Sequence, residues 1–163
     1  MKNMKISLYH GSNAEVRQPE ILPRLRALDF GAGFYLTSNQ EQAIRWARLV
    51  ARRRGTAQAI LNRYLFNTAY NSRLRVKHFH EAGEDWLEFV VANRCALPVA
   101  AYDLIVGPVA NDATLPVIDD YIDGRYTREE AIRRLLPQRL TDQYAFLTPA
   151  ALAFLEFDGS EIL

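Results

Sequence analysis

A histidine followed by glycine, and an aromatic segment behind two further glycines, are the residues best suited to bind a ligand. His10 ends a short apolar run, and its imidazole can hydrogen-bond a hydroxyl group. Gly11 allows a ligand to approach its backbone, since no Cβ lies in the way. Tyr35 follows the glycine-containing residues 31–34, and Trp46 lies in the helical segment that comes next. Together these residues indicate a site for a flat ring attached to a ribose.

Each of these features also has a plainer explanation. His10-Gly11 alone is more simply a turn that carries a surface histidine. Phe34 and Tyr35 point to opposite faces of a strand, so one of them packs in the core and the other can line a cleft. Aromatic residues at such spacing are more often core residues than ligand contacts. The functional interpretation therefore rests on the combination of the two segments.

Composition limits the possibilities. With 163 residues, 49% hydrophobic and 24% charged, the chain is expected to form a single domain over residues 1–163. A net charge of +1 gives no strong overall field for nucleic acid or membrane. Cys95 is the one cysteine, which excludes an internal disulfide, and His10, His78 and His80 form no convincing metal site. The N-terminal apolar run is too short for a signal sequence or a membrane span, so a cytoplasmic protein is expected.

Hydrophobic periodicity predicts strands interspersed with helices. Residues 13–29 contain two prolines and little periodicity, which indicates a loop. The expected strands are 6–9, 34–37, 59–66, 104–106 and 143–147, and the expected helices are 40–53, 85–95, 115–121, 128–136 and a terminal one over 149–155. Gly31-Ala32-Gly33 precedes its strand and lacks the third glycine of a dinucleotide-binding turn, so a doubly wound nucleotide fold is disfavoured. The pattern favours an α+β domain with mostly antiparallel strands.

Capping residues define the ends of two of these helices. Ser38 is the expected N-cap of the first, with Glu41 as its capping-box partner, and Gly55 ends it. Thr127 is expected to cap the helix from residue 128, with Glu130 as its partner.

The ordered motifs resemble the ADP-ribosyltransferase superfamily, in the branch of poly-ADP-ribose polymerases and diphtheria-like toxins that uses a His-Tyr-Glu triad. The motifs are Leu8-Tyr9-His10-Gly11-Ser12, Gly31-x-Gly33-x-Tyr35-Leu36-Thr37, Ala43 and Trp46. The match covers roughly residues 6–47 and, more weakly, 143–157. The segments 29–37, 102–112 and 142–146 also resemble an uncharacterised bacterial domain family of the same fold. The resemblance implies two small, mostly antiparallel sheets that form an NAD cleft, with helices around them.

The resemblance also implies roles for individual residues. His10 matches the histidine that bonds the nicotinamide ribose, and Gly11 matches the glycine whose backbone holds the carboxamide, with Ser12 beside it in the cofactor site. Tyr35 matches the tyrosine that stacks on nicotinamide, and Trp46 falls where the family has a second stacking ring. Ala43 falls where the family often has a serine that bonds the carboxamide.

The glutamate of the triad corresponds to Gln143 in this sequence. A carboxylate bonds the ribose and also offsets the positive charge that develops as nicotinamide leaves, whereas glutamine does only the first. Loss of such electrostatic stabilisation lowers the reaction rate by a factor on the order of 10²–10³. The resemblance therefore implies transfer of a single ADP-ribose unit in preference to chain elongation. Asp112 and Asp142 are candidate assisting acids, and turn or capping roles are the alternative.

The leading hypothesis is an NAD-dependent mono-ADP-ribosyltransferase that modifies a protein or a nucleic acid. The bacterial resemblance adds a toxin or defence effector held in check by a small cognate inhibitory protein. One alternative is a binding module without turnover, for NAD, an ADP-ribosylated ligand or another protein. Another is RNA 2′-phosphate transfer to NAD, which needs a basic pocket for which Arg52–Arg54 are candidates, although a solvated helix end explains them more simply. Asn93-Arg94 suggests either an anion contact or a structural salt bridge.

Overall fold

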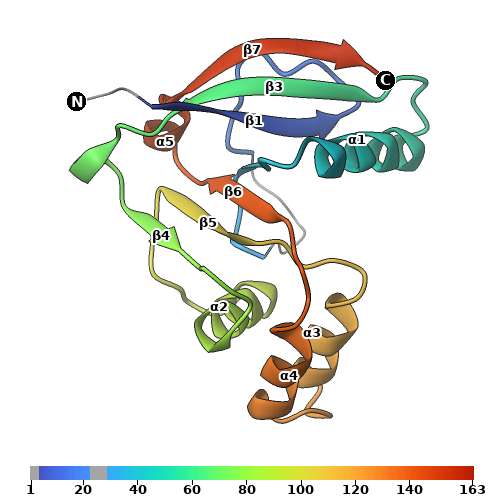
Figure 1. Cartoon of the computed structure of the whole chain (residues 1–163), viewed down its shortest axis with the longest axis vertical. Helices are drawn as coiled ribbons and strands as arrows, with labels where there is room; N and C mark the ends of the chain where they lie inside the picture. The colour runs from blue at the N-terminus through green and yellow to red at the C-terminus, as the bar shows by residue number, and fades with distance from the viewer. Residues whose placement is uncertain (1–3, 23–28) are drawn as a thin grey trace.

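The computed structural model describes residues 4–22 and 29–163 (Figure 1). The elements in chain order are β1 (Lys5–Ser12), β2 (Phe34–Leu36), α1 (Gln40–Arg54), β3 (Ile60–Asn67), the 3-10 turn η1 (Asn71–Arg73), β4 (Val76–His78), α2 (Glu84–Arg94), β5 (Leu104–Pro108), α3 (Leu115–Ile122), α4 (Arg128–Leu135), β6 (Asp142–Phe146), α5 (Pro149–Leu152) and β7 (Leu155–Ile162).

The strands form two sheets. One is three-stranded in the order β1-β3-β7, and the other is four-stranded in the order β2-β6-β5-β4. All described pairings are antiparallel except that of β4 with β5, which is parallel. The predicted α+β class with two small, mostly antiparallel sheets is therefore confirmed.

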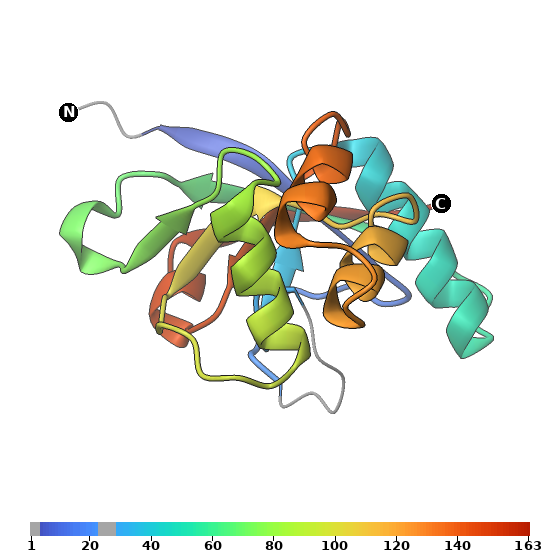
Figure 2. The same cartoon turned by 90° about the horizontal axis from the view of Figure 1, so that it is seen from below.

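The four-stranded sheet lies between two hydrophobic layers. Phe34, Leu104 and Phe146 belong to the core shared with the three-stranded sheet, whereas Ile105 and Ala145 belong to the core shared with α2, α3 and α4. This division follows from the alternation of side chains along each strand. Figure 2, seen from below, shows these helices in front of the sheet.

Helix α1 begins at Gln40, as predicted, but its N-cap lies one residue later than the expected Ser38. Asn39 is its N-cap, because its side chain accepts a hydrogen bond from the Gln42 N–H at 2.9 Å. Ser38 is not the cap, since its hydroxyl donates to the Asp142 carboxylate instead. Gly55 ends the helix with φ 64, as predicted, because a left-handed C-cap favours glycine.

The predicted terminal helix over residues 149–155 is wrong after its first turn. The helix ends at Leu152, and β7 follows as an edge strand on β3. Leu155 and Phe157 pack against the core while Glu156 and Asp158 alternate with them, which is the period of a strand. The strand β4 was also not predicted, and β1 extends to Ser12, beyond the expected end at residue 9.

Asp103 connects three segments around the four-stranded sheet. Its carboxylate accepts hydrogen bonds from the Arg75 backbone N–H at 2.8 Å, from the Arg75 guanidinium at 3.1 Å and from the Thr148 hydroxyl at 2.8 Å. The guanidinium bond is the main reason that the pKa of Asp103 falls to about 2, against the opposing effect of burial. The charged carboxylate therefore holds β4, β5 and the start of α5 together.

Replacing Asp103 by asparagine should lower the free energy of unfolding by about 2 kcal/mol at pH 7, because the hydrogen bonds to Arg75 and Thr148 would no longer have a charged acceptor. Because the pKa in the folded protein lies below that of the unfolded chain, this stabilisation is present above about pH 4 and is lost as the pH falls toward 2. Urea unfolding at pH 7 and near pH 3 measures both effects. Asp158→Asn, at an exposed ion pair with Arg63, is the control and should cost less than about 0.5 kcal/mol. Equal losses in the two variants would contradict the assignment.

Candidate functional site

His10 and Tyr35 meet where the two sheets join. The His10 Nδ1 lies 2.7 Å from the backbone carbonyl oxygen of Tyr35. Because a carbonyl only accepts, Nδ1 carries the proton, and Nε2 is then the acceptor nitrogen of the neutral ring. The imidazole also packs on Phe34, with ring centroids 4.2 Å apart. The structure thus brings together two residues that are far apart in sequence, with the imidazole held on two sides.

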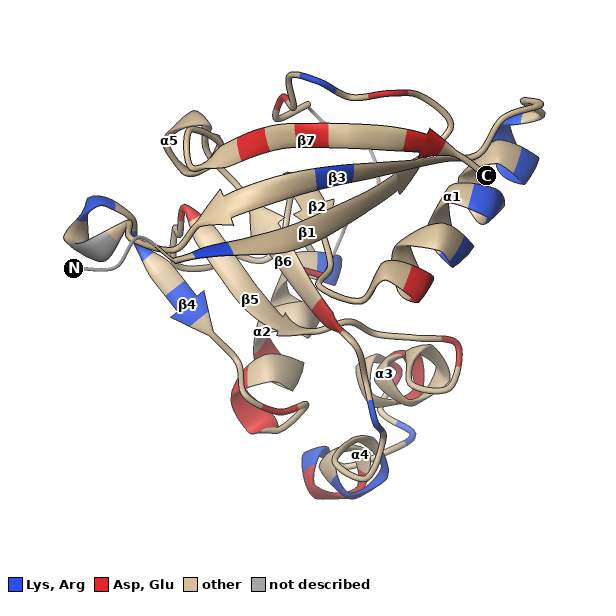
Figure 3. Cartoon of the chain, turned by 45° about the horizontal axis from the view of Figure 1, so that its top comes forward, with Lys and Arg blue, Asp and Glu red and all other residues tan. Residues whose placement is uncertain are grey.

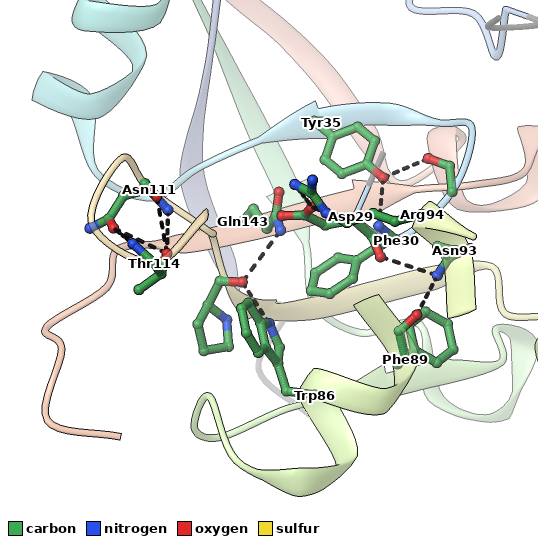
Figure 4. Close-up of polar contacts among 12 residues, drawn as sticks. Asp29, Phe30, Tyr35, Trp86, Phe89, Asn93, Arg94, Asn111, Thr114 and Gln143 are labelled. Carbon is green, nitrogen blue, oxygen red and sulfur yellow. Dashed lines mark hydrogen bonds and ion pairs between the residues drawn. The ribbon is translucent and has the colours of Figure 1, made fainter. Parts of the chain in front are cut away.

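The phenol of Tyr35 fixes the glycine-containing turn that precedes β2. Its hydroxyl accepts a hydrogen bond from the Phe30 N–H at 3.1 Å and donates one to the Gly31 carbonyl at 2.5 Å (Figure 4). The side chain is half-buried. The orientation of the ring is therefore determined by the fold, as a stacking surface requires.

Gly11 has a packing role that the sequence did not reveal. A Cβ at this position would lie 2.0 Å from the Ala43 carbonyl oxygen and 2.6 Å from the Ala47 nitrogen. Ala43 and Ala47 are fully buried, so α1 packs directly on the backbone of β1. Positions 11 and 43 of the predicted cofactor site are thus in contact, and the role of the Gly11 backbone toward a ligand stays a prediction. Ser12, next to it, accepts a hydrogen bond from the Ala14 N–H at 3.4 Å.

Gln143 lies on the same face of the four-stranded sheet as Tyr35. Tyr35 pairs with Ala145 across β2 and β6, so Gln143 is its diagonal neighbour, at roughly 7–8 Å for such pairs. The amide of Gln143 donates to the Pro108 carbonyl at 3.3 Å, and the Trp86 indole N–H donates to the same oxygen at 2.9 Å (Figure 4). Only 3% of Gln143 is exposed. Its amide is therefore part of the interior of the domain.

Aromatic side chains cover the face on which Gln143 lies. Phe30 and Phe79 are buried, and both lie against Gly107, which pairs with Gln143. A Cβ at Gly107 would lie 3.0 Å from the Phe79 Cβ and 3.2 Å from the Phe30 ring. The absence of a side chain at Gly107 thus makes room for the ring of Phe30 next to Gln143.

The loop that carries Phe30 is held by the end of α2. Arg94 forms an ion pair with Asp29 at 2.8 Å, and the Asn93 amide donates to the Asp29 carbonyl at 3.1 Å. Of the two interpretations of Asn93-Arg94, the structural salt bridge is confirmed. In the sequence, Asp29 and Phe30 stand out only as part of a resemblance motif. No local pattern indicates that Trp86 shares an acceptor with Gln143.

Trp46 lies in a surface groove away from the junction of His10 and Tyr35. It is half-buried and lines a groove of about 670 Å³ between α1 and residues 110–113. His10, Tyr35 and Gln143 are not among the described residues that line it. The pairing of Trp46 with Tyr35 around one ring stays a prediction.

The two candidate acids differ in their surroundings. Asp142 accepts hydrogen bonds from the Thr37 hydroxyl at 3.0 Å, the Ser38 N–H at 2.8 Å and the Ser38 hydroxyl. These hydrogen bonds match the turn or capping role expected as the alternative for Asp142, because they fix the residues that lead into α1. Asp112 is exposed and lines the groove beside Trp46.

Residues 6–157 match a family model described as "Protein of unknown function (DUF3990)". The chain belongs to this family. Comparison with curated proteins and with solved structures found no match. The matched region of the DUF3990 domain runs from β1 into β7 and includes His10, Tyr35 and Gln143.

Two further features of the described part of the DUF3990 domain concern metal ions and membranes. Within residues 4–22 and 29–163, no group of His, Cys, Asp and Glu is arranged to hold a metal ion. In the same residues, no helix has the length and apolar character needed to cross a membrane.

Gly11→Ala in the DUF3990 domain should destabilise the fold by about 3 kcal/mol, since the new methyl group overlaps the backbone of α1. Gly83→Ala is the matched control, because a Cβ there meets only the flexible end of Glu81 and should cost less than about 1 kcal/mol. Urea unfolding of both variants measures the difference. A Gly11 variant as stable as the control would contradict the close packing of α1 on β1.

Gln143→Glu should make the stability of the DUF3990 domain depend on pH. The introduced carboxylate would face the Pro108 carbonyl in a buried position, so burial should raise the pKa of the new carboxyl group. A raised pKa means that stability falls as the pH rises above about 4.3, with a loss of roughly 2 kcal/mol at pH 8. Urea unfolding at acidic and basic pH tests this. Gln143→Leu, which cannot ionise, should show no added pH dependence, and equal profiles would show that position 143 reaches solvent.

Proposed function

We propose that this chain is an NAD-dependent mono-ADP-ribosyltransferase that modifies a protein or a nucleic acid. The observation that carries the proposal is the junction of β1 and β2, where His10 bonds the Tyr35 backbone. Next to it, Gly11 lies under Ala43. These are four of the positions that the superfamily resemblance assigns to one cofactor site.

The chemistry of the side chains fits one part of NAD. In its neutral form the imidazole of His10, with Nδ1 donating to a carbonyl, can accept a hydrogen bond from a ribose hydroxyl through Nε2. The fixed ring of Tyr35 offers a surface for nicotinamide. NAD, when bound, supplies the ADP-ribosyl group and nicotinamide as the leaving group.

The residues of the chain would then act mainly by positioning. His10 holds the ribose in place, and Tyr35 orients the ring that leaves, so that an acceptor can attack the ribose carbon from the opposite side. Gln143 carries no charge and cannot offset the positive charge of the transition state. We therefore expect slow transfer of single ADP-ribose units to a reactive acceptor.

A second function is favoured by the state of Gln143. The residue is 3% exposed and its amide donates to the Pro108 carbonyl, so the side chain is engaged within the protein. A domain with this arrangement would bind NAD or an ADP-ribosylated ligand without turnover.

The exposed free thiol of Cys95 suits a reducing compartment such as the cytoplasm for either function. A role as a bacterial effector with a small inhibitory partner rests on the resemblance alone.

Nicotinamide release from NAD by the purified chain, freed of other proteins, tests the proposal. The wild-type chain should release nicotinamide and label an acceptor, and His10→Ala and Tyr35→Ala should each lower the rate by about 10²-fold because the cofactor would no longer be held in position. His78→Ala is the matched control, since His78 is exposed on β4, and its rate should equal that of the wild type.

Three outcomes separate the two functions. Release that depends on His10 and Tyr35 supports the transferase. NAD binding by calorimetry without release, sensitive to the same two variants, supports the binding module. The absence of both binding and release rejects both.

A further inference from the structure

The groove beside Trp46, named here the α1 groove, has the dimensions of a ligand site. It is lined by Gln42, Arg45, Trp46, Arg48, Leu49 and Arg52 of α1 and by residues 110–113. Its volume of about 670 Å³ lies within the range typical of ligand sites. Of its three arginines, Arg45 and Arg48 have no role in the functions discussed above, and Arg52 was considered only for the phosphate pocket of the RNA alternative.

The α1 groove has a strong positive charge. Arg45, Arg48 and Arg52 stand at positions i, i+3 and i+7, so they share one side of the helix. Among the described residues, none of the three forms an ion pair, whereas the arginines of β3, α2 and α4 do. Figure 3 shows the basic residues along α1 and acidic ones on β7, so the small net charge hides a local separation. Asp112 is the one carboxylate residue that lines the groove in the described part of the chain.

An aromatic ring lies among these charges. Trp46 is half-buried in the groove, next to Leu49 and Arg45. The opposite wall is held in place by Asn111, whose side chain accepts from the Ala113 and Thr114 N–H groups at 3.0 Å (Figure 4). Proteins that bind single-stranded nucleic acid combine these features in a concave surface. Their basic residues contact the phosphates, and their aromatic rings stack on the bases.

The two walls of the α1 groove belong to segments that also contact residues of the candidate site. Helix α1 carries Ala43, which packs over Gly11, and the loop at residues 110–113 follows Pro108, whose carbonyl binds Gln143. A strand held in the groove would therefore lie on the same elements that position the site.

From these observations we infer that the α1 groove binds single-stranded nucleic acid. Arg45 and Arg52 lie about 10 Å apart along the helix axis, which is several times the axial spacing of the charges of one duplex strand, about 3.4 Å. More than one phosphate can therefore be bound while a base stacks on Trp46. The further claim that this strand is the acceptor for ADP-ribose rests on the proposed function, whereas the binding itself does not.

The test is fluorescence anisotropy with labelled single-stranded DNA and RNA of about 12 nucleotides, without NAD. Arg45→Gln/Arg48→Gln should weaken binding at least about tenfold and lower the salt slope by roughly 1.4, which is 0.7 for each phosphate that an arginine no longer neutralises. Arg53→Gln/Arg54→Gln changes the net charge equally on the same helix but outside the groove, and it should weaken binding less than about threefold. Trp46→Leu should weaken binding about tenfold, and Trp46→Phe should retain most of it.

Several results would overturn the inference. These are an absence of binding at roughly 50 mM salt, equal losses in the two arginine pairs, or equal binding of polyglutamate. Displacement of the oligonucleotide by NAD, with the same dependence on Arg45 and Arg48, would make the groove a dinucleotide site and reject it as a strand site. Because no step uses NAD turnover, oligonucleotide binding with no nicotinamide release would reject the transferase and leave this inference intact. Nicotinamide release without oligonucleotide binding would support the transferase and reject this inference.

Discussion

The hydrogen bonds between β1 and the end of β2 are the interactions on which the candidate site depends. Tyr9 and Thr37 exchange backbone hydrogen bonds at 2.8 and 2.9 Å, and they join the three-stranded sheet to the four-stranded one. His10, the next residue, bonds the Tyr35 carbonyl. Asp142 then bonds Thr37 from β6. One short region therefore holds the two sheets, the imidazole and the start of α1 in a fixed relation.

The candidate residues near this region differ in how their side chains are held. His10 and Tyr35 lie at the junction, with their orientations set by backbone hydrogen bonds. Gln143 is on the Tyr35 face of the sheet, but its amide is held by the Pro108 carbonyl and flanked by buried aromatic residues. A glutamate at this position would place an ionisable carboxyl group in the same interior. The glutamine is compatible with that interior, and this gives a physical reason for its presence that is independent of any activity.

Local patterns in the sequence were sufficient for much of the fold. The 3.6-residue period and Gly55 gave α1 almost to the residue, and Thr127 gave the start of α4, where its side chain accepts from the Glu130 N–H. The end of the chain was wrong because Pro149 and the alanines favour a helix locally, while pairing with β3 determines the structure from Leu155 onward.

The site was predictable only in part. The proximity of His10 and Tyr35 followed from the order of the motifs, but the packing of Gly11 against Ala43 depends on how α1 lies on β1, which no local pattern encodes. The α1 groove was hidden for a similar reason, since its two walls are more than fifty residues apart in sequence. The arginine spacing is visible in the sequence, yet only the opposite wall makes it a concave site.

A crystal structure with a non-hydrolysable NAD analogue tests the central claim most directly. We expect nicotinamide against the ring of Tyr35, with a hydroxyl of its ribose within hydrogen-bond distance of the His10 Nε2. An analogue bound only in the α1 groove, with its phosphates on Arg45 and Arg48 and no contact to His10, would contradict the account.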